Sequence, residues 1–266
     1  LAQIITDTCT TIPNTPGPQL TPIPTGGRAL VPNASLAPTD DRRIREAIFL
    51  ALDPGVSLRV VFGEAFESDV ATILCAPFDV ESPVCDPDLY YSYDRDGAKG
   101  LVADYVADGG EASLELVYFQ TQTAEVTYVQ QQLAAIGITA NLRSVDAAGL
   151  GQAQSAGDYG IFWGSTASAG FPTVWTRYSA NGTNWGRATI PALEEALQQA
   201  RSPMDLDERN AGWREVNRVL HDELVLQWAL PYPSAMVARD ELHLGTEERP
   251  YTGSTMVYLD TAWLDQ

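Results

Sequence analysis

The sequence predicts an α/β fold in which helices flank a mixed, largely parallel sheet. Between Leu114 and Gly164, segments that alternate with a period of two are interleaved with segments of helical spacing, in the order strand, helix, strand, helix, strand. Helices that connect successive strands in this order cover a largely parallel sheet. The 266 residues suffice for one large domain or two modest ones, and 45% hydrophobic residues can build a sizeable core.

The first part of the chain is expected to be mostly extended. Residues 1–26 are rich in Thr, Pro and Gly and predict extended chain and turns, whereas 28–31 predict a short strand. A helix is expected next, since apolar residues recur on one face at Ile44, Ala47, Ile48 and Ala51. Thr39 or Asp40 can cap it, and the pair Asp40 and Asp41 is typical of a helix cap.

The remaining elements follow from periodicity and from stop signals. Asp94 is placed to cap a helix, and Gly137 to end one, because glycine readily adopts the left-handed conformation after a last turn. Trp213 lies at helical spacing and is expected in the core. In chain order, the other expected elements are the strand 114–118, the helix 126–136, the strand 138–145, the helix 147–156, the strand 159–164, the helices 189–201 and 205–224, and the strands 226–230, 235–238 and 256–259.

Charge and motif content exclude several classes of function. The formal net charge of −19 repels phosphate backbones, so no nucleic-acid partner is expected. No run of about 18 apolar residues occurs, so no membrane-spanning helix is expected. His221 and His243 lack metal-ligand spacing, and no Gly-x-Ser-x-Gly motif occurs. We therefore expect no metal, no cofactor and no enzymatic activity.

A disulfide is expected between two of the three cysteines, and it would imply an oxidising compartment. Cys75 and Cys85 flank a proline-rich loop of a length that suits a local disulfide, which would stabilise the fold by about 3 kcal/mol. The alternative is two unpaired buried thiols. Cys9 would then be left over, with a partner outside this sequence.

Six segments, in the right order, resemble blocks of a known family: the extracytoplasmic solute-binding proteins of ABC importers, in the oligopeptide, dipeptide and nickel class (bacterial solute-binding protein family 5). The segments are Asn-Ala-Ser-Leu-Ala-Pro-Thr-Asp-Asp-Arg-Arg-Ile-Arg-Glu-Ala at 33–47, Tyr-Asp-Arg-Asp-Gly-Ala-Lys at 93–99, Gln-Leu-Ala-Ala-Ile-Gly-Ile at 132–138, and the stretches 158–163, 206–220 and 230–233.

The resemblance implies one lobe of a periplasmic-binding-protein-like fold of type II. Residues 34–231 would form the ligand-binding lobe, 1–33 the connecting strands that belong to the other lobe, and 232–266 the return segment to it. Family members usually carry a first lobe before this part, so the chain is expected to be the C-terminal part of a longer protein. A naturally short homologue is the alternative.

The resemblance also implies a function in transport. The expected partners are a small solute, such as a peptide, and the membrane permease of an ABC importer, with a monomeric solute-binding protein. The expected location is extracytoplasmic, either periplasmic or lipid-anchored to the cell membrane through an N-terminal segment outside this sequence.

The expected ligand site lies where the strand 159–164 ends. Trp163 matches a family tryptophan at the binding cleft, and glycine at 164 would let backbone approach a ligand closely. An aromatic wall is expected from the tryptophans that follow, although these side chains could instead be core. The candidate ligand-binding residues are Trp163, Gly164, Ser165, Thr166, Trp175, Trp185 and Tyr232. Arg177 could clamp a ligand carboxylate or be a solvated surface residue.

One departure from the family bears on the ligand. Peptide-binding members often carry an acidic residue just after this Gly-Trp, which pairs with the ligand's ammonium group, but residues 164–168 contain no carboxylate. A buried ammonium without a counter-ion is costly, so dipeptides with a free amino terminus should bind poorly or meet a carboxylate of the other lobe.

Two other classes of function remain open from the sequence. A secreted hydrolase acting on peptide or glycan would need two acidic residues that converge in a pocket. A sensor or interaction lobe would show an exposed apolar patch away from the cleft. The sequence does not identify the ligand.

Overall fold

The computed structural model describes residues 19–23, 27–53, 56, 59–60, 77–78, 82–89, 91–166, 171–231, 234–238, 242–243 and 263–264 of the 266.

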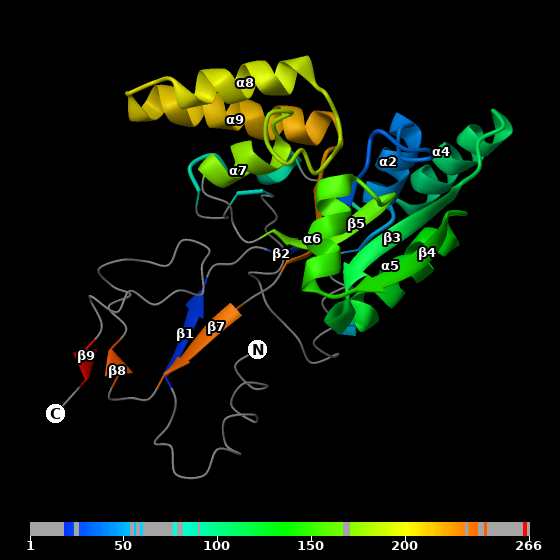
Figure 1. The fold of residues 1–266 in the computed structure, drawn as a ribbon, viewed down its shortest axis with the longest axis horizontal. Helices are drawn as coiled ribbons and strands as arrows, with labels where there is room; N and C mark the ends of the chain where they lie inside the picture. The colour runs from blue at the N-terminus through cyan, green and yellow to red at the C-terminus, as the bar shows by residue number, and fades with distance from the viewer. Residues whose placement is uncertain are drawn as a thin grey trace, which may run out of the picture.

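A five-stranded mixed sheet lies at the centre of the described chain (Figure 1). Its strands follow the order β4 (Thr139–Val145), β3 (Ser113–Phe119), β5 (Ile161–Thr166), β2 (Gly27–Pro32) and β6 (Gln227–Pro231). β3 runs parallel to β4 and β5, whereas β2 pairs antiparallel with β5 and β6. The predicted α/β class with a mixed sheet is therefore confirmed.

Helices cover both faces of this sheet (Figure 1). One hydrophobic core contains residues of the helices α2, α4 and α5, and the other contains residues of α6 to α9. Successive residues of β5 alternate between the two cores, as the pleat of a strand requires: Trp163 belongs to the first and Phe162 to the second. The helices are α2 (Arg42–Leu50), α4 (Arg95–Ala107), α5 (Thr123–Ala135), α6 (Ala147–Ala156), α7 (Phe171–Tyr178), α8 (Pro191–Arg201) and α9 (Leu206–Asp222), with the short 3-10 helices η2 (Pro87–Leu89) and η3 (Gln120–Gln122).

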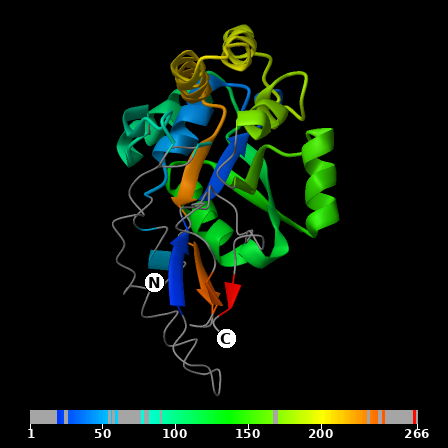
Figure 2. The ribbon, with the colours of Figure 1, turned by 90° about the vertical axis from the view of Figure 1, so that its left-hand side faces the viewer.

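Two small antiparallel pairs lie apart from the central sheet (Figures 1 and 2). β1 (Gln19–Ile23) pairs with β7 (Ser234–Ala238), and β8 (Leu242–His243) pairs with β9 (Trp263–Leu264). β1 precedes β2 in the chain and β7 follows β6. The neighbouring strands β2 and β6 are thus each connected to one strand of the same outer pair.

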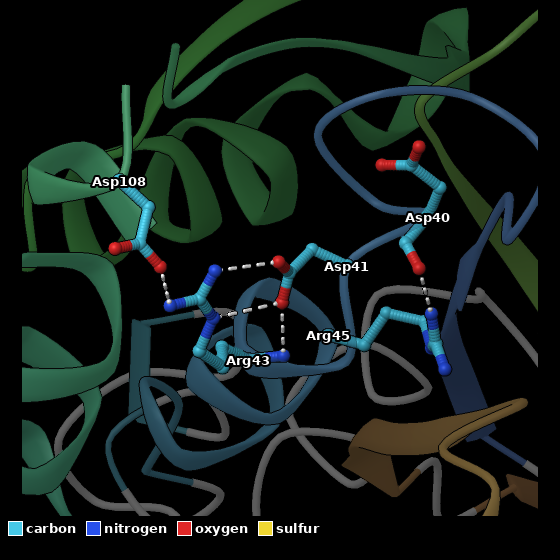
Figure 3. Close-up of polar contacts among 5 residues, drawn as sticks. All are labelled: Asp40, Asp41, Arg43, Arg45 and Asp108. Carbon is cyan, nitrogen blue, oxygen red and sulfur yellow. Dashed lines mark hydrogen bonds and ion pairs between the residues drawn. The ribbon is translucent and has the colours of Figure 1, made fainter. Parts of the chain in front are cut away.

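The start of α2 is fixed by a small network of charged side chains (Figure 3). The carboxylate of Asp41 accepts a hydrogen bond from the backbone N–H of Arg43 at 2.8 Å and thereby caps the helix. Nη2 of Arg43 lies 2.8 Å from Oδ2 of Asp41, and its Nη1 lies 2.7 Å from Oδ2 of Asp108 at the end of α4. The buried Arg45 donates to the carbonyls of Thr39 and Asp40, each at 3.0 Å. These contacts tie the start of α2 to α4.

Several sequence predictions are confirmed by the element boundaries. Asp94 caps α4 by accepting from the backbone N–H of Gly97 at 2.9 Å. Gly137 follows α5 with a φ of +97°, the left-handed conformation expected at a helix stop. Trp213 is 2% exposed in the second core.

Other sequence predictions are corrected. The cap of α2 is Asp41, a member of the predicted pair Asp40 and Asp41, and not Thr39, because the buried Thr39 hydroxyl donates to the carbonyl of Asn33 at 2.7 Å. Residues 27–32, which were expected among the connecting strands of the other lobe, form β2 in the central sheet, and the division of the chain between two lobes stays a prediction. Helix α7 was not predicted, and β1 lies in a segment expected to be extended chain and turns. The strand expected at 256–259 lies outside the described residues.

Candidate functional site

A pocket of about 530 Å³ opens at the edge of the sheet where β3, β4 and β5 end. Ligands of α/β proteins characteristically bind at the carboxyl ends of the strands, and this volume lies within the usual range for small-molecule sites. The side chains that line it come from β2, β3, η3, β5, α6 and the segment after α7. They are Arg28, Phe119, Thr121, Gln122, Ala147, Leu150, Gly151, Gln154, Phe162 and Trp185.

Helix α6 supplies one wall of the pocket. Ala147, Leu150, Gly151 and Gln154 recur at the spacing of a single helix face. The helix is fixed at its start by Asp146, which accepts from the backbone N–H of Gly149 at 2.7 Å. One face of α6, fixed in place at the start of the helix, therefore forms a wall of the pocket.

Trp185 supplies an aromatic wall and is held from several sides. Its ring centroid lies 5.4 Å from that of Phe162 and 6.2 Å from that of Tyr178, both in edge-on geometry. The guanidinium carbon of Arg177 lies 4.5 Å from the Trp185 ring centroid, a cation–π contact. Arg177 therefore packs on the ring of Trp185. This contact accounts for its position without a ligand carboxylate and without full solvation.

Glu125 is the central residue of the polar network beside the pocket, and sequence reasoning missed it. Its side chain is 9% exposed, and Oε2 accepts from Nε1 of Trp163 at 3.0 Å and from Nε of Arg28 at 3.1 Å. With its amide oxygen turned toward Arg28, Gln122 accepts from Nη1 and Nη2 at 3.2 Å. A glutamate in the first turn of an amphipathic helix resembles a surface residue in sequence, so no local signal marks it.

The predicted cleft residues Trp163 and Gly164 lie inside the lobe. Trp163 is 1% exposed, and its ring packs in the first core between the sheet and its helices. At Gly164, a Cβ atom would lie 1.9 Å from Cζ of Phe162, so the absent side chain makes room for the ring that lines the pocket. These positions shape the pocket through Phe162 and Glu125, and direct ligand contact at them stays a prediction.

Of the two other predicted tryptophans, one lines the pocket and one does not. Trp185 lines the pocket, whereas Trp175 packs beside the second core with the guanidinium carbon of Arg201 4.6 Å from its ring centroid. The backbones of Ser165 and Thr166 pair with Arg28 and Gly27 of β2. Tyr232 lies outside the described residues.

The other chemistry-bearing side chains that the structure describes do not line the pocket. Cys85 is half-buried, and Cys75 and Cys9 lie outside the described residues, so the pairing of Cys75 with Cys85 stays a prediction. His221 stacks on Tyr91, with ring centroids 4.4 Å apart. Within the described ranges, no group of three or more His, Cys, Asp or Glu residues could hold a metal ion. No helix in that part of the chain is both long and apolar enough to cross a membrane.

Comparison with known proteins agrees with this architecture. Residues 6–187 match the family described as bacterial extracellular solute-binding proteins, family 5 middle. The di/tripeptide-binding protein 2 of Pseudomonas aeruginosa (strain UCBPP-PA14) is 23% identical over 206 residues, which are 72% of this chain and 38% of that protein.

Two solved structures illustrate the likeness of fold. The ABC transporter substrate-binding protein CtaP of Listeria monocytogenes superposes with a TM-score of 0.75 at 16% identity, covering 95% of this chain and 52% of that one. The oligopeptide-binding protein AppA of Bacillus subtilis, in complex with a nonapeptide, gives 0.72 at 16% identity, covering 98% and 54%. The chain spans about half the length of these structures, and its fold is that of type II periplasmic binding proteins. The protein belongs to the bacterial extracellular solute-binding proteins of family 5.

Proposed function

We propose that the chain supplies one lobe of a two-lobe clamp that binds a small solute for an ABC importer of the peptide and nickel type. The observation that carries this proposal is the pocket at the carboxyl edge of the sheet, in a chain that belongs to a solute-binding family. Clamps of this kind close two lobes over the ligand and exclude water from it. The second lobe would come from sequence outside these residues, in keeping with coverage of about half of the related structures.

A peptide is the proposed solute. One relative is described as a di/tripeptide-binding protein and one structural neighbour holds a nonapeptide. The pocket offers aromatic surface together with side-chain amides, a combination that suits peptide groups. The proposed partner is the membrane permease of the importer, and the protein is proposed to act as a monomer outside the cytoplasm, in the periplasm or on a lipid anchor.

Binding rather than catalysis is the proposed activity. A hydrolase that uses paired carboxylates needs two acidic side chains facing one pocket. Among the described residues that line the pocket, none is acidic. We also propose the disulfide between Cys75 and Cys85, because the two cysteines flank a proline-rich loop of a length that suits a local disulfide.

Ligand identification in the full-length protein with both lobes tests the proposal. Mass spectrometry of the material that co-purifies with it is expected to find a peptide, and calorimetry should then give saturable binding of that peptide. Absence of any retained solute, together with absence of heat from a panel of di-, tri- and oligopeptides, would refute the proposal. Within the panel, dipeptides with a free amino terminus should bind more weakly than their N-acetylated forms; sub-micromolar binding of all free dipeptides would refute this order.

Two tryptophan variants separate the pocket from general packing. Trp185→Ala removes a pocket wall and is expected to weaken peptide binding about tenfold or more, the equivalent of about 1.4 kcal/mol. Trp175→Ala is the matched control, because Trp175 is also half-buried but does not line the pocket. Equal losses in both variants would show that binding does not depend on this pocket.

A further inference from the structure

Among the described residues that line the pocket, one is charged, and a carboxylate lies beside it. Among the described lining residues, only Arg28 is ionic, and its side chain is 19% exposed. Glu125, which is not part of the lining, lies behind it with Oε2 3.1 Å from Nε of Arg28. The pair is formally neutral, so the pocket presents aromatic and aliphatic surface with uncharged polar groups around it.

A charged ligand group would therefore lose its hydration without full compensation. An ammonium group would meet the guanidinium of Arg28 and, among the described lining residues, no carboxylate. A carboxylate would meet a guanidinium whose charge Glu125 already balances. An uncharged side chain loses little hydration and gains contact with the rings of Phe119, Phe162 and Trp185.

We propose that this pocket receives an uncharged, mainly apolar side chain of the ligand, and that Glu125 sets this preference by balancing the charge of Arg28. The inference rests on the proposed function only in taking the ligand to be peptide-like. It makes Glu125 a specificity-determining residue that acts through Arg28 rather than by touching the ligand.

Gly151 sets the room available to that side chain. A Cβ atom on Gly151 would meet no atom within 4 Å apart from its chain neighbours and its own helix backbone, and the residue lines the pocket from α6. The position is therefore open to a side chain that reduces the volume of the pocket. Gly100 in α4 is the matched control, because its Cβ position is equally open and it does not line the pocket.

The experiment uses this chain and four probes, the N-acetyl amides of phenylalanine, leucine, glutamate and lysine. These probes have no terminal charges and differ only in the side chain. Binding is followed by NMR through the indole resonance of Trp185. We expect the phenylalanine and leucine probes to bind about tenfold more tightly than the glutamate and lysine probes. Gly151→Leu should abolish binding of the phenylalanine probe, and Gly100→Leu should leave it unchanged.

Two variants that each remove one charge test the role of Glu125, because they should shift the probe preference in opposite directions. Glu125→Gln removes the negative charge beside the guanidinium of Arg28 and should shift the preference about tenfold toward the glutamate probe, whereas Arg28→Gln should shift it toward the lysine probe. If either variant fails to fold, the direction in which the other shifts the probe preference still tests the proposal.

The inference is overturned if no probe shifts the Trp185 resonance, if a charged probe binds the parent chain as tightly as the phenylalanine probe, or if Gly151→Leu has no effect. Peptide retention by the full-length protein would survive any of these results. Conversely, a full-length protein that binds no peptide would end the proposed function while the probe preference could still hold.

Discussion

The carboxylate of Glu125 lies 3.0 Å from the indole nitrogen of Trp163, and this bond joins helix α5 to the strand β5 inside the lobe. The same oxygen accepts from Arg28 in β2. One buried carboxylate thus fixes the orientation of a core tryptophan and of a pocket arginine, which links the packing of the lobe to the composition of its pocket.

Removal of this carboxylate should destabilise the fold. Glu125→Ala leaves the indole N–H and a largely buried guanidinium without this acceptor, and we expect a loss of about 2–4 kcal/mol in the free energy of unfolding. Urea denaturation at neutral pH measures it. Glu195→Ala on the exposed face of α8 is the control and should change stability by less than about 0.5 kcal/mol. Similar values for the two variants would contradict the structural role of Glu125.

Gly164 should tolerate no side chain. Gly164→Ala places a methyl group where the Phe162 ring lies, and we expect a loss of about 1–3 kcal/mol as the ring is displaced. Gly100→Ala, at an open helical position, should instead stabilise by about 0.5–1 kcal/mol. Thermal or urea unfolding of both variants checks this contrast, and a neutral effect at Gly164 would mean that Phe162 is not packed as described.

The stabilisation that Asp41 contributes to the fold should be lost at acidic pH. The hydrogen bond from the Arg43 side chain lowers the pKa of Asp41 below its ordinary value. Because the folded-state pKa is depressed, the stabilisation is fully present above the unfolded value of about 3.9 and is lost as the pH falls through the folded value.

The variants at this position separate charge from capping. Asp41→Asn keeps a capping side chain but cannot titrate, so its unfolding free energy should change less below about pH 4 than that of the parent. Asp41→Ala should cost about 1 kcal/mol at neutral pH through loss of the cap. Asp40→Asn, at an exposed position that does not cap α2, is the control; a flattened acid profile in this variant instead would refute the assignment.

His221 should destabilise the fold on mild acidification. Burial lowers the pKa of His221, with the nearby Asp222 and Asp86 opposing part of the effect. The unfolded chain takes up a proton near pH 6.5, so stability should fall as the pH decreases from about 6.5 toward the lower folded value. His221→Phe keeps a ring against Tyr91 and should flatten this part of the profile, measured by urea unfolding between pH 8 and pH 5.

Local sequence signals determined most of the secondary structure and the fold class. Asp94, Gly137 and Trp213 have the roles that their positions predict, because capping, left-handed backbone and helical periodicity depend on residues a few positions apart. Where three local candidates competed for the cap of α2, namely Thr39, Asp40 and Asp41, a tertiary contact removed Thr39, since its hydroxyl donates to the carbonyl of Gly160.

The pocket was decided by the tertiary structure. Glu125 meets Trp163 across 38 positions of sequence and Arg28 across 97, and no periodic pattern reports such contacts. The aromatic wall was predicted as a group, but only folding shows that Trp185 faces the pocket while Trp163 is buried behind it. The physical reason is the pleat of β5. Neighbouring residues of a strand point to opposite faces, and the sequence alone does not say which face adjoins the pocket, so the ring of Phe162 lines it and that of Trp163 does not.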